Sequence, residues 1–190
     1  MSSAKNAAEG NRGRLVLVVG PSGAGKDTLL DYVRERLAGD ERFRFVRRTI
    51  TRPVSVGEDH QPSTPEAFAR QVAAGEFALH WQANGLSYGL PSSVRKWIAD
   101  GRIVIANGSR AILPEAETSF SGLQTIVVTA APAVLAARLA ARGRETEAAI
   151  LERMKRSASM PEITGNVWIV DNSGSVDEAG EAMLHALSRD

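Results

Sequence analysis

The chain has 190 residues, of which 43% are hydrophobic, so it can bury one ordinary core, and its length favours a single domain. Its 23 basic and 22 acidic residues leave a net charge of +1, which gives no whole-surface attraction for nucleic acid or for an anionic membrane. The absence of cysteine excludes a disulfide framework and cysteine-based metal or redox chemistry.

The amino-terminal segment, residues 1–13, is polar and lacks the apolar stretch that a secretory signal needs. We expect a mobile tail over 1–13, followed by one domain over 14–190. The apolar runs along the chain are too short to span a bilayer. We therefore expect a cytoplasmic protein with no membrane partner.

Apolar runs and periodic segments then alternate along the chain. Buried strands are predicted at 15–19, 102–107 and 124–130, a last strand at 166–172, and a further extended segment at 42–51. Helices are predicted at 27–38, 64–75, 92–100, 131–143, 145–159 and 175–188, the second opened by Thr64 as N-cap with Pro65 in its first turn. A short strand is expected at 77–81 and a loop at 82–91. This order predicts an α/β fold with a parallel five-stranded sheet flanked by helices.

The sequence GPSGAGKDT, residues 20–28, lies between a predicted buried strand and an amphipathic helix. Its glycines allow successive N–H groups to face one anion, and the start of the helix favours negative charge. This context favours a nucleotide-binding phosphate loop over a glycine-rich turn that binds nothing. The expected nucleotide-binding residues are Gly20, Pro21, Ser22, Gly23, Ala24, Gly25, Lys26, Asp27 and Thr28.

Asp27 is unusual, because the phosphate-loop pattern has Ser or Thr directly after the lysine. One interpretation is that the Asp27 carboxylate binds Mg²⁺, directly or through water. The other is that an acidic residue in the first turn of a helix is favoured by the helix dipole, by ~0.3–1 kcal/mol. Both interpretations stay open, and Asp27 is the candidate metal ligand.

Several segments together resemble the guanylate kinase family over nearly the whole chain from about residue 14. They are GPSGAGK, TRPVSVGED, the YG pair at Tyr88 and Gly89, and LAARGRETEAAILERM. The resemblance implies a P-loop kinase with small acceptor-binding and lid regions. It places lid arginines at Arg138, Arg142 and Arg153, with Arg144 as a further candidate, although the first two also fit a solvated basic helix face.

Two departures from that family concern the acceptor. Leu79 and Leu90 stand where guanylate kinases carry the glutamate and threonine that help to read guanine, so guanine is a poor candidate. The patterns GPSG.GKD, ITR, W.ANGL.YG, NGSRA and RGRE resemble instead the ribose 1,5-bisphosphate phosphokinases of phosphonate breakdown. This resemblance implies that ATP, with Mg²⁺, phosphorylates ribose 1,5-bisphosphate to 5-phosphoribosyl 1-diphosphate.

The resemblance also implies residue roles. The catalytic candidates Lys26, Arg138, Arg142 and Arg153 would neutralise the transferring group, and no general base is needed because the acceptor oxygen is already ionised. The acceptor-binding candidates are Arg48, Arg52, His60, Asn84, Tyr88, Asn107, Ser109 and Arg110. Simpler interpretations stay open for two of these, because His60 could be structural and Tyr88 could close a turn.

Two other functions are compatible with the same motifs. One is a guanylate or other nucleoside monophosphate kinase. The other is a non-catalytic guanylate-kinase-like binding module, which is disfavoured because Lys26 and the lid arginines are present. The expected partner is a small phosphorylated sugar and not nucleic acid, and the sequence gives no indication of an oligomeric state.

Overall fold

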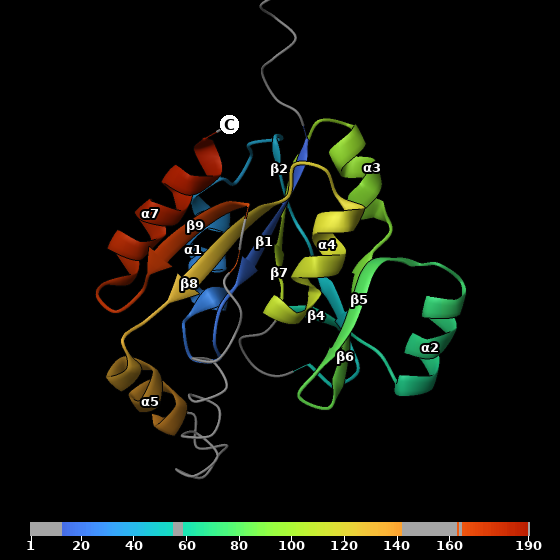
Figure 1. Cartoon of the computed structure of the whole chain (residues 1–190), viewed down its shortest axis with the longest axis horizontal. Coiled ribbons are helices and arrows are strands. Elements are labelled where there is room, and N and C mark those ends of the chain that lie inside the picture. Colours follow the sequence, from blue (N-terminus) through green and yellow to red (C-terminus); the bar gives the residue numbers. More distant parts are fainter. Residues whose placement is uncertain (1–12, 55–58, 142–162, 164, 190) are drawn as a thin grey trace, which may run out of the picture. The chain divides into compact units, whose positions relative to one another are not determined.

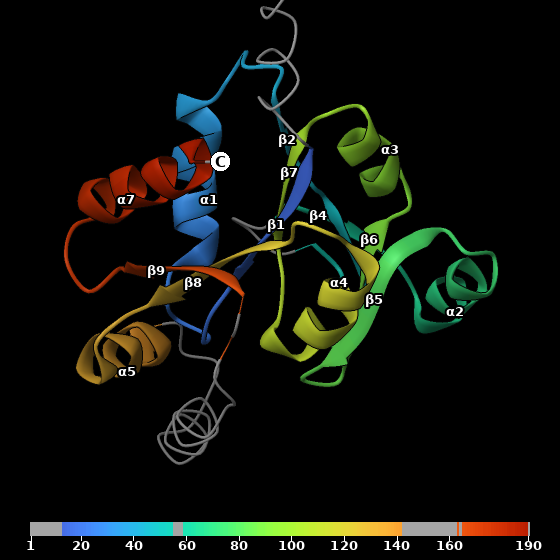
Figure 2. The same ribbon diagram turned by 45° about the horizontal axis from the view of Figure 1, so that its top comes forward.

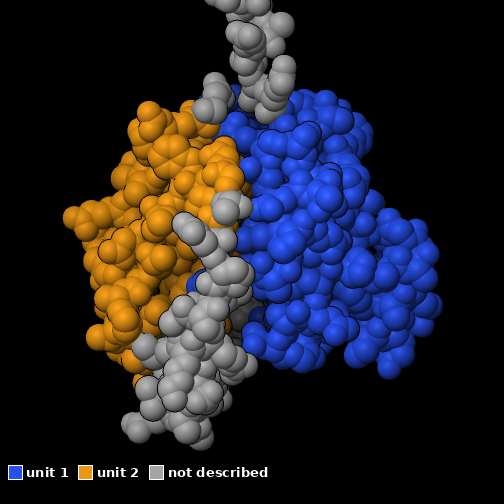
Figure 3. Space-filling view, viewed as in Figure 1, with its two compact units in different colours: residues 1–17, 37–123, 190 blue, residues 18–36, 124–189 orange. Residues whose placement is uncertain are grey.

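The computed structural model describes residues 13–54, 59–141, 163 and 165–189 (Figure 1). The chain divides into two compact units, one containing 1–17 and 37–123 and the other containing 18–36 and 124–189 (Figure 3). Residues 1–12 of the expected tail, the predicted helix at 145–159 and three of the four lid arginine candidates lie outside the described residues.

The predicted parallel sheet is confirmed. Among the described residues, five strands follow the order β2-β7-β1-β8-β9, and β2 pairs in parallel with β7 as β8 does with β9. All six residues of β1 are buried, as expected for a strand covered on both faces. The strands are β1 (Arg14–Val19), β2 (Phe43–Phe45), β7 (Ile103–Asn107), β8 (Gln124–Thr129) and β9 (Asn166–Asp171).

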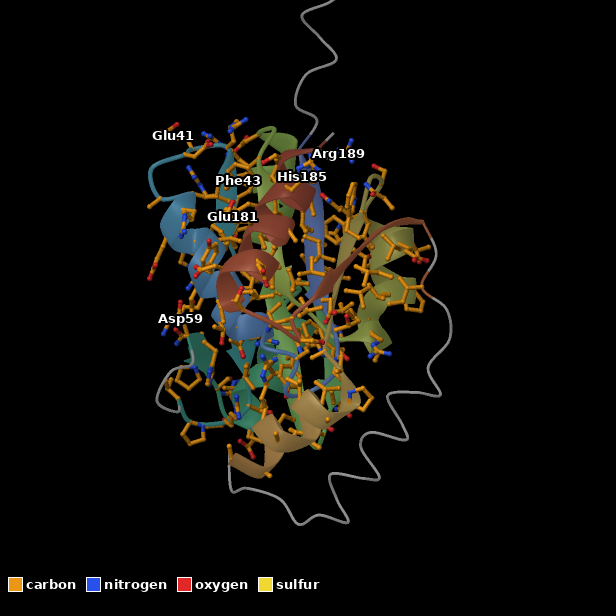
Figure 4. The ribbon with its side chains drawn as sticks, turned by 90° about the vertical axis from the view of Figure 1, so that its left-hand side faces the viewer. Glu41, Phe43, Asp59, Glu181, His185 and Arg189 are labelled. Carbon is orange, nitrogen blue, oxygen red and sulfur yellow. The ribbon has the colours of Figure 1, made fainter. Side chains whose placement is uncertain are left out.

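The amphipathic helix predicted after the phosphate loop is present as α1. α1 buries Leu29, Leu30 and Val33 and lies beside α7 in both ribbon views (Figure 1, Figure 2). The Tyr32 hydroxyl of α1 donates to the carboxylate of Glu181, which projects from α7, over 2.8 Å (Figure 4). The helices accompanying these strands are α1 (Lys26–Arg36), α3 (Ser93–Ala99), η1 (Arg110–Ile112), α4 (Leu113–Ser119), α5 (Pro132–Ala141) and α7 (Val176–Ser188).

A second sheet was not predicted. Its described strands follow the order β4-β3-β6-β5, namely β4 (His60–Pro62), β3 (Arg48–Ile50), β6 (Leu86–Pro91) and β5 (Phe77–Ala83). The expected loop at 82–91 was therefore wrong: Asn84 (φ 51°) and Gly85 (φ 74°) form a two-residue hairpin turn that returns the chain as β6. The expected extended segment at 42–51 is split, because β2 joins the first sheet and β3 the second.

The predicted N-cap of the helix next to this second sheet is confirmed. α2 (Pro65–Ala73) begins after Thr64, whose hydroxyl oxygen accepts a hydrogen bond from the Ala67 N–H over 3.2 Å. Across the part of the chain that the structure describes, no helix is both long and apolar enough to cross a bilayer.

Candidate active site

The phosphate loop connects β1 to α1, as predicted, and its path depends on glycine at two positions. Gly20 has φ 148°, and a Cβ there would overlap the backbone oxygen of Val128 in β8. Gly25 has φ 87°, and a Cβ there would overlap the side-chain nitrogen of Asn172. Side chains are excluded at both positions, so the backbone can make the tight curl that places its N–H groups around an anion.

Lys26 is the first residue of α1, and its ammonium group reaches back across the loop. Nζ donates to the backbone oxygens of Gly20 over 2.8 Å and of Pro21 over 3.0 Å. Lys26 lies at the carboxyl end of the loop, and these two hydrogen bonds hold its half-buried ammonium group at the amino end. A positive charge and the first amides of α1 lie together, which is the arrangement that favours bound phosphate.

Arg138, on α5, is the lid arginine candidate that the structure describes, and it lies beside this loop. Its Nη1 is 3.7 Å from the position that a Cβ on Gly25 would take. This nitrogen is buried and has no hydrogen-bond partner among the described residues. Because an unsatisfied buried donor is costly, an anion at the loop would relieve that cost. Arg142, Arg144 and Arg153 lie outside the described residues.

Asp27 and Thr28 are exposed in the first turn of α1. Within the described residues, no group of three or more His, Cys, Asp or Glu side chains could hold a metal ion. Mg²⁺ usually binds one or two carboxylates together with phosphate oxygens and water, without an all-protein cage. A single carboxylate at Asp27, next to a phosphate loop, fits a metal ion held in that way.

Three of the acceptor-binding candidates lie on one face of the second sheet. Arg48 is paired with His60 across β3 and β4, and Ile50 is paired with Tyr88 across β3 and β6, which places all four side chains on the same face. The Arg48 guanidinium carbon is 5.7 Å from the centre of the Tyr88 ring. Trp81, opposite Tyr88 on β5, stacks on that ring with centroids 5.4 Å apart.

His60 is almost fully buried, at 1% exposed, and it holds the segment that carries Arg52. Its Nε2 lies 3.2 Å from the backbone oxygen of Arg52. Since a carbonyl oxygen only accepts, this ring nitrogen carries the hydrogen. The described contact of His60 therefore positions Arg52, and its predicted contact with phosphate stays a prediction. Asp59, directly before β4, pairs with Arg47 over 2.7 Å (Figure 4).

The remaining candidates are placed at turns and at the end of β7. Asn107 ends β7 and is buried. Ser109 caps η1, because its hydroxyl oxygen accepts from the Ala111 N–H over 3.3 Å. Burial lowers the pKa of the Arg110 guanidinium, which remains a cation at neutral pH. Asn84 is exposed at the hairpin turn. Its positive φ of 51°, which asparagine tolerates, accounts for an asparagine at this position.

Two contacts of the site were missed by sequence reasoning. One is the stacking of Trp81 on Tyr88, which required recognising the hairpin. The other is Asn172, whose side chain contacts the phosphate loop. The available signal for Asn172 was a polar residue that ends the predicted strand at 166–172, at the strand end where α/β sheets bind ligands.

Comparisons with known proteins bear on the family and the fold. A family model described as an AAA domain matches residues 16–160. The guanylate kinase from Anaplasma phagocytophilum has a similar fold, with a TM-score of 0.63 and 15% identity, covering 93% of this chain and 85% of that one. A gluconokinase from Sinorhizobium meliloti 1021 gives a TM-score of 0.53 and 18% identity, covering 94% of each chain. The fold is of the guanylate-kinase-like P-loop type, with the phosphate loop between β1 and α1.

Curated relatives narrow this class. The chain is 48% identical over 177 residues to the ribose 1,5-bisphosphate phosphokinase PhnN of Brucella melitensis biotype 2. The aligned region covers 93% of this chain and 92% of the relative. The protein of the same name from Thiobacillus denitrificans is 45% identical and covers 94% of both. The one from Agrobacterium fabrum is 44% identical and covers 92% of this chain and 96% of the relative. The chain belongs to the ribose 1,5-bisphosphate phosphokinase family.

Proposed function

We propose that this protein transfers the γ-phosphoryl group of ATP to ribose 1,5-bisphosphate, giving 5-phosphoribosyl 1-diphosphate and ADP. An ionised oxygen of the 1-phosphate bonds to the γ-phosphorus while the bond from that phosphorus to the β,γ-bridging oxygen breaks, so no proton must be removed. The observation that carries the proposal is the phosphate loop, where Lys26 spans two loop carbonyls and Arg138 presents a buried donor beside Gly25. The names of the relatives supply the acceptor.

On this proposal the donor phosphates bind where cationic and N–H groups converge. Lys26 and the loop amides hold the β- and γ-phosphates, and Arg138 holds the transferring group with its planar donors. Arg142 and Arg153, from the expected lid, would complete that shell. Asp27 is the proposed protein ligand of Mg²⁺, which would neutralise part of the phosphate charge when bound.

The proposed acceptor site uses the second sheet, and its apolar residues argue for a sugar over guanine. Arg48, Arg52 and Tyr88 would hold the phosphates of the acceptor. Leu79 and Leu90 are paired across β5 and β6 and are 1% and 0% exposed. The positions that read guanine in guanylate kinases are therefore filled by packed apolar side chains with no hydrogen-bonding group.

We propose that residues 14–190 act as one catalytic domain in the cytoplasm, where ATP is available. The unit that carries the phosphate loop takes residues from both sides of 37–123 in the sequence. Because the chain leaves that unit and returns to it, the two units are not separable by a single cut. This interleaving supports one domain.

A substrate panel tests the proposed function. Purified protein is incubated with ATP, Mg²⁺ and either ribose 1,5-bisphosphate or GMP, and the products are identified by phosphorus NMR. We expect a new diphosphate doublet pair with the sugar and no detectable product with GMP. Turnover of GMP with none of the sugar would replace this proposal with a nucleoside monophosphate kinase, and failure to bind ATP with Mg²⁺ would favour a non-catalytic module.

The role of Asp27 in binding metal is tested by Asp27→Asn. We expect the Mg²⁺ concentration for half-maximal velocity to rise several-fold, because a neutral amide replaces a hard anionic ligand. The measurement is an ADP-release assay across a Mg²⁺ titration at fixed ATP. Asp31→Asn is the matched control, since Asp31 is exposed on the same helix and pairs with Arg34 over 2.7 Å. Superimposable titrations for Asp27→Asn and wild type would leave Asp27 only its helix-end role.

A further inference from the structure

Asn172, directly after β9, is a buried polar residue that none of the recognised motifs contains. It is 1% exposed. Its backbone N–H donates to the Thr129 oxygen over 2.8 Å, and the hydroxyl of the next residue, Ser173, accepts from the Ala131 N–H over 2.8 Å. The segment that carries Asn172 is therefore hydrogen-bonded to the end of β8, and this fixes the backbone from which the Asn172 side chain projects.

The Asn172 side chain is bonded to the phosphate loop. Its Nδ2 donates to the backbone oxygen of Ala24 over 2.7 Å, in a buried hydrogen bond. The peptide between Ala24 and Gly25 is planar and trans, so its C=O and its N–H point in opposite directions. With the Ala24 oxygen held toward Asn172, the Gly25 N–H must point away from it.

Gly25 and Asn172 are fitted to each other. The amide nitrogen of Asn172 occupies the space that a Cβ on Gly25 would need, and Arg138 Nη1 lies near the same point. The Asn172 Oδ1 is buried and has no hydrogen-bond partner among the described residues. Nδ2 thus holds the loop, and it makes the hydrogen bond that accounts for burying the Asn172 amide.

We infer that Asn172 is a positioning residue for the nucleotide: it fixes the Ala24–Gly25 peptide so that the Gly25 N–H is oriented before ATP arrives. The inference rests on the proposed function, because it assigns the loop to ATP phosphates. Hydrogen-bond donors that are fixed in advance need not reorganise when an anion binds, and this saving strengthens the binding of the anion. A purely structural amide would stabilise the fold without changing ATP affinity.

Asn172→Leu separates these two roles, because leucine has the same branched side-chain skeleton and removes the donor without adding charge. We expect the Kd for ATP, measured by calorimetry without acceptor, to rise about tenfold to a hundredfold. We also expect kcat to fall and the KM of the sugar to stay unchanged. The matched control is Gln124→Met: Gln124 is also 1% exposed, and its Nε2 donates to the Ala186 oxygen over 2.8 Å at the opposite end of β8.

Both substitutions remove a buried side-chain amide that donates to a backbone oxygen, so we expect both to lower the melting temperature, but only Asn172→Leu to weaken ATP binding. An unchanged Kd in folded Asn172→Leu, or an equal rise in Gln124→Met, would overturn the inference. Asn172→Ser, whose hydroxyl is too short to reach Ala24, gives the same test with a smaller side chain if the leucine variant does not fold. Wild-type protein that fails to bind ATP would instead contradict the proposed function.

Discussion

Lys26→Ala is expected to lower kcat about hundredfold to thousandfold, equivalent to ~2.7–4 kcal/mol of transition-state stabilisation. The ammonium group is held by the Gly20 and Pro21 oxygens, so it is already in place when the phosphates bind. Removing it takes away a fixed charge that opposes the charge on the transferring group. The measurement is ADP release at saturating ATP and sugar, with circular dichroism to show that the variant is folded.

Lys96→Ala is the matched control for this prediction. Lys96 is exposed on α3 and pairs with Asp100 over 2.8 Å, so its loss removes the same charge from the protein at a surface position. We expect its kcat to equal that of wild type, since exposed pairs contribute little. Lys26→Ala retaining more than about a tenth of wild-type kcat would show that the loop amides suffice without the lysine.

The first sheet could be predicted from sequence because its signals are local. The run LVLVV in β1 is apolar at every position and rich in β-branched residues, a pattern that is typical of a strand buried on both faces. The second sheet was missed because β3 and β4 have only three residues each and because the residues of β6 were expected to form a loop. The clearest local signal there was the pair Asn84 and Gly85, whose positive φ values define a hairpin.

The phosphate loop could be recognised for a similar reason, since Gly20, Gly25 and Lys26 are close in sequence. Their spacing is constant because all three must surround the same phosphate group. Asn172 could not be assigned in this way. It is 148 positions from Ala24, and only the pairing of β8 with β9 and the turn after β9 bring its amide to the loop. Sequence pattern gives the period of a strand but not which distant residue its end will contact.

The acceptor residues were named by resemblance, and the fold explains why spacing alone did not group them. Arg48, His60 and Tyr88 come from three different strands, and their common face follows from strand register. His60 illustrates the remaining ambiguity, because a buried histidine that donates to the Arg52 oxygen has a positioning role whether or not it also meets phosphate.

Arg138→Met is expected to lower kcat about a thousandfold, the scale on which an arginine that stabilises a transferring phosphoryl group contributes. Arg138→Lys is expected to recover only part of this loss, because lysine restores the charge without the planar pair of donors. The measurement is single-turnover phosphoryl transfer at saturating substrates. The control is Arg34→Met on α1, which removes a surface arginine paired with Asp31 and should leave the rate unchanged.

Thermal stability gives this prediction a second, independent readout. In the free protein, Arg138 Nη1 is buried without a hydrogen-bond partner among the described residues, so the wild type carries the cost of desolvating that donor. Arg138→Met removes the donor, and the melting temperature without ATP should therefore stay level or rise. ATP should then raise the melting temperature of wild type more than that of the variant, because a ligand stabilises in proportion to how tightly it binds the folded state. A variant that loses stability and activity together would show that Arg138 holds α5 in place, since an arginine held ready for phosphate must cost stability until the phosphate binds.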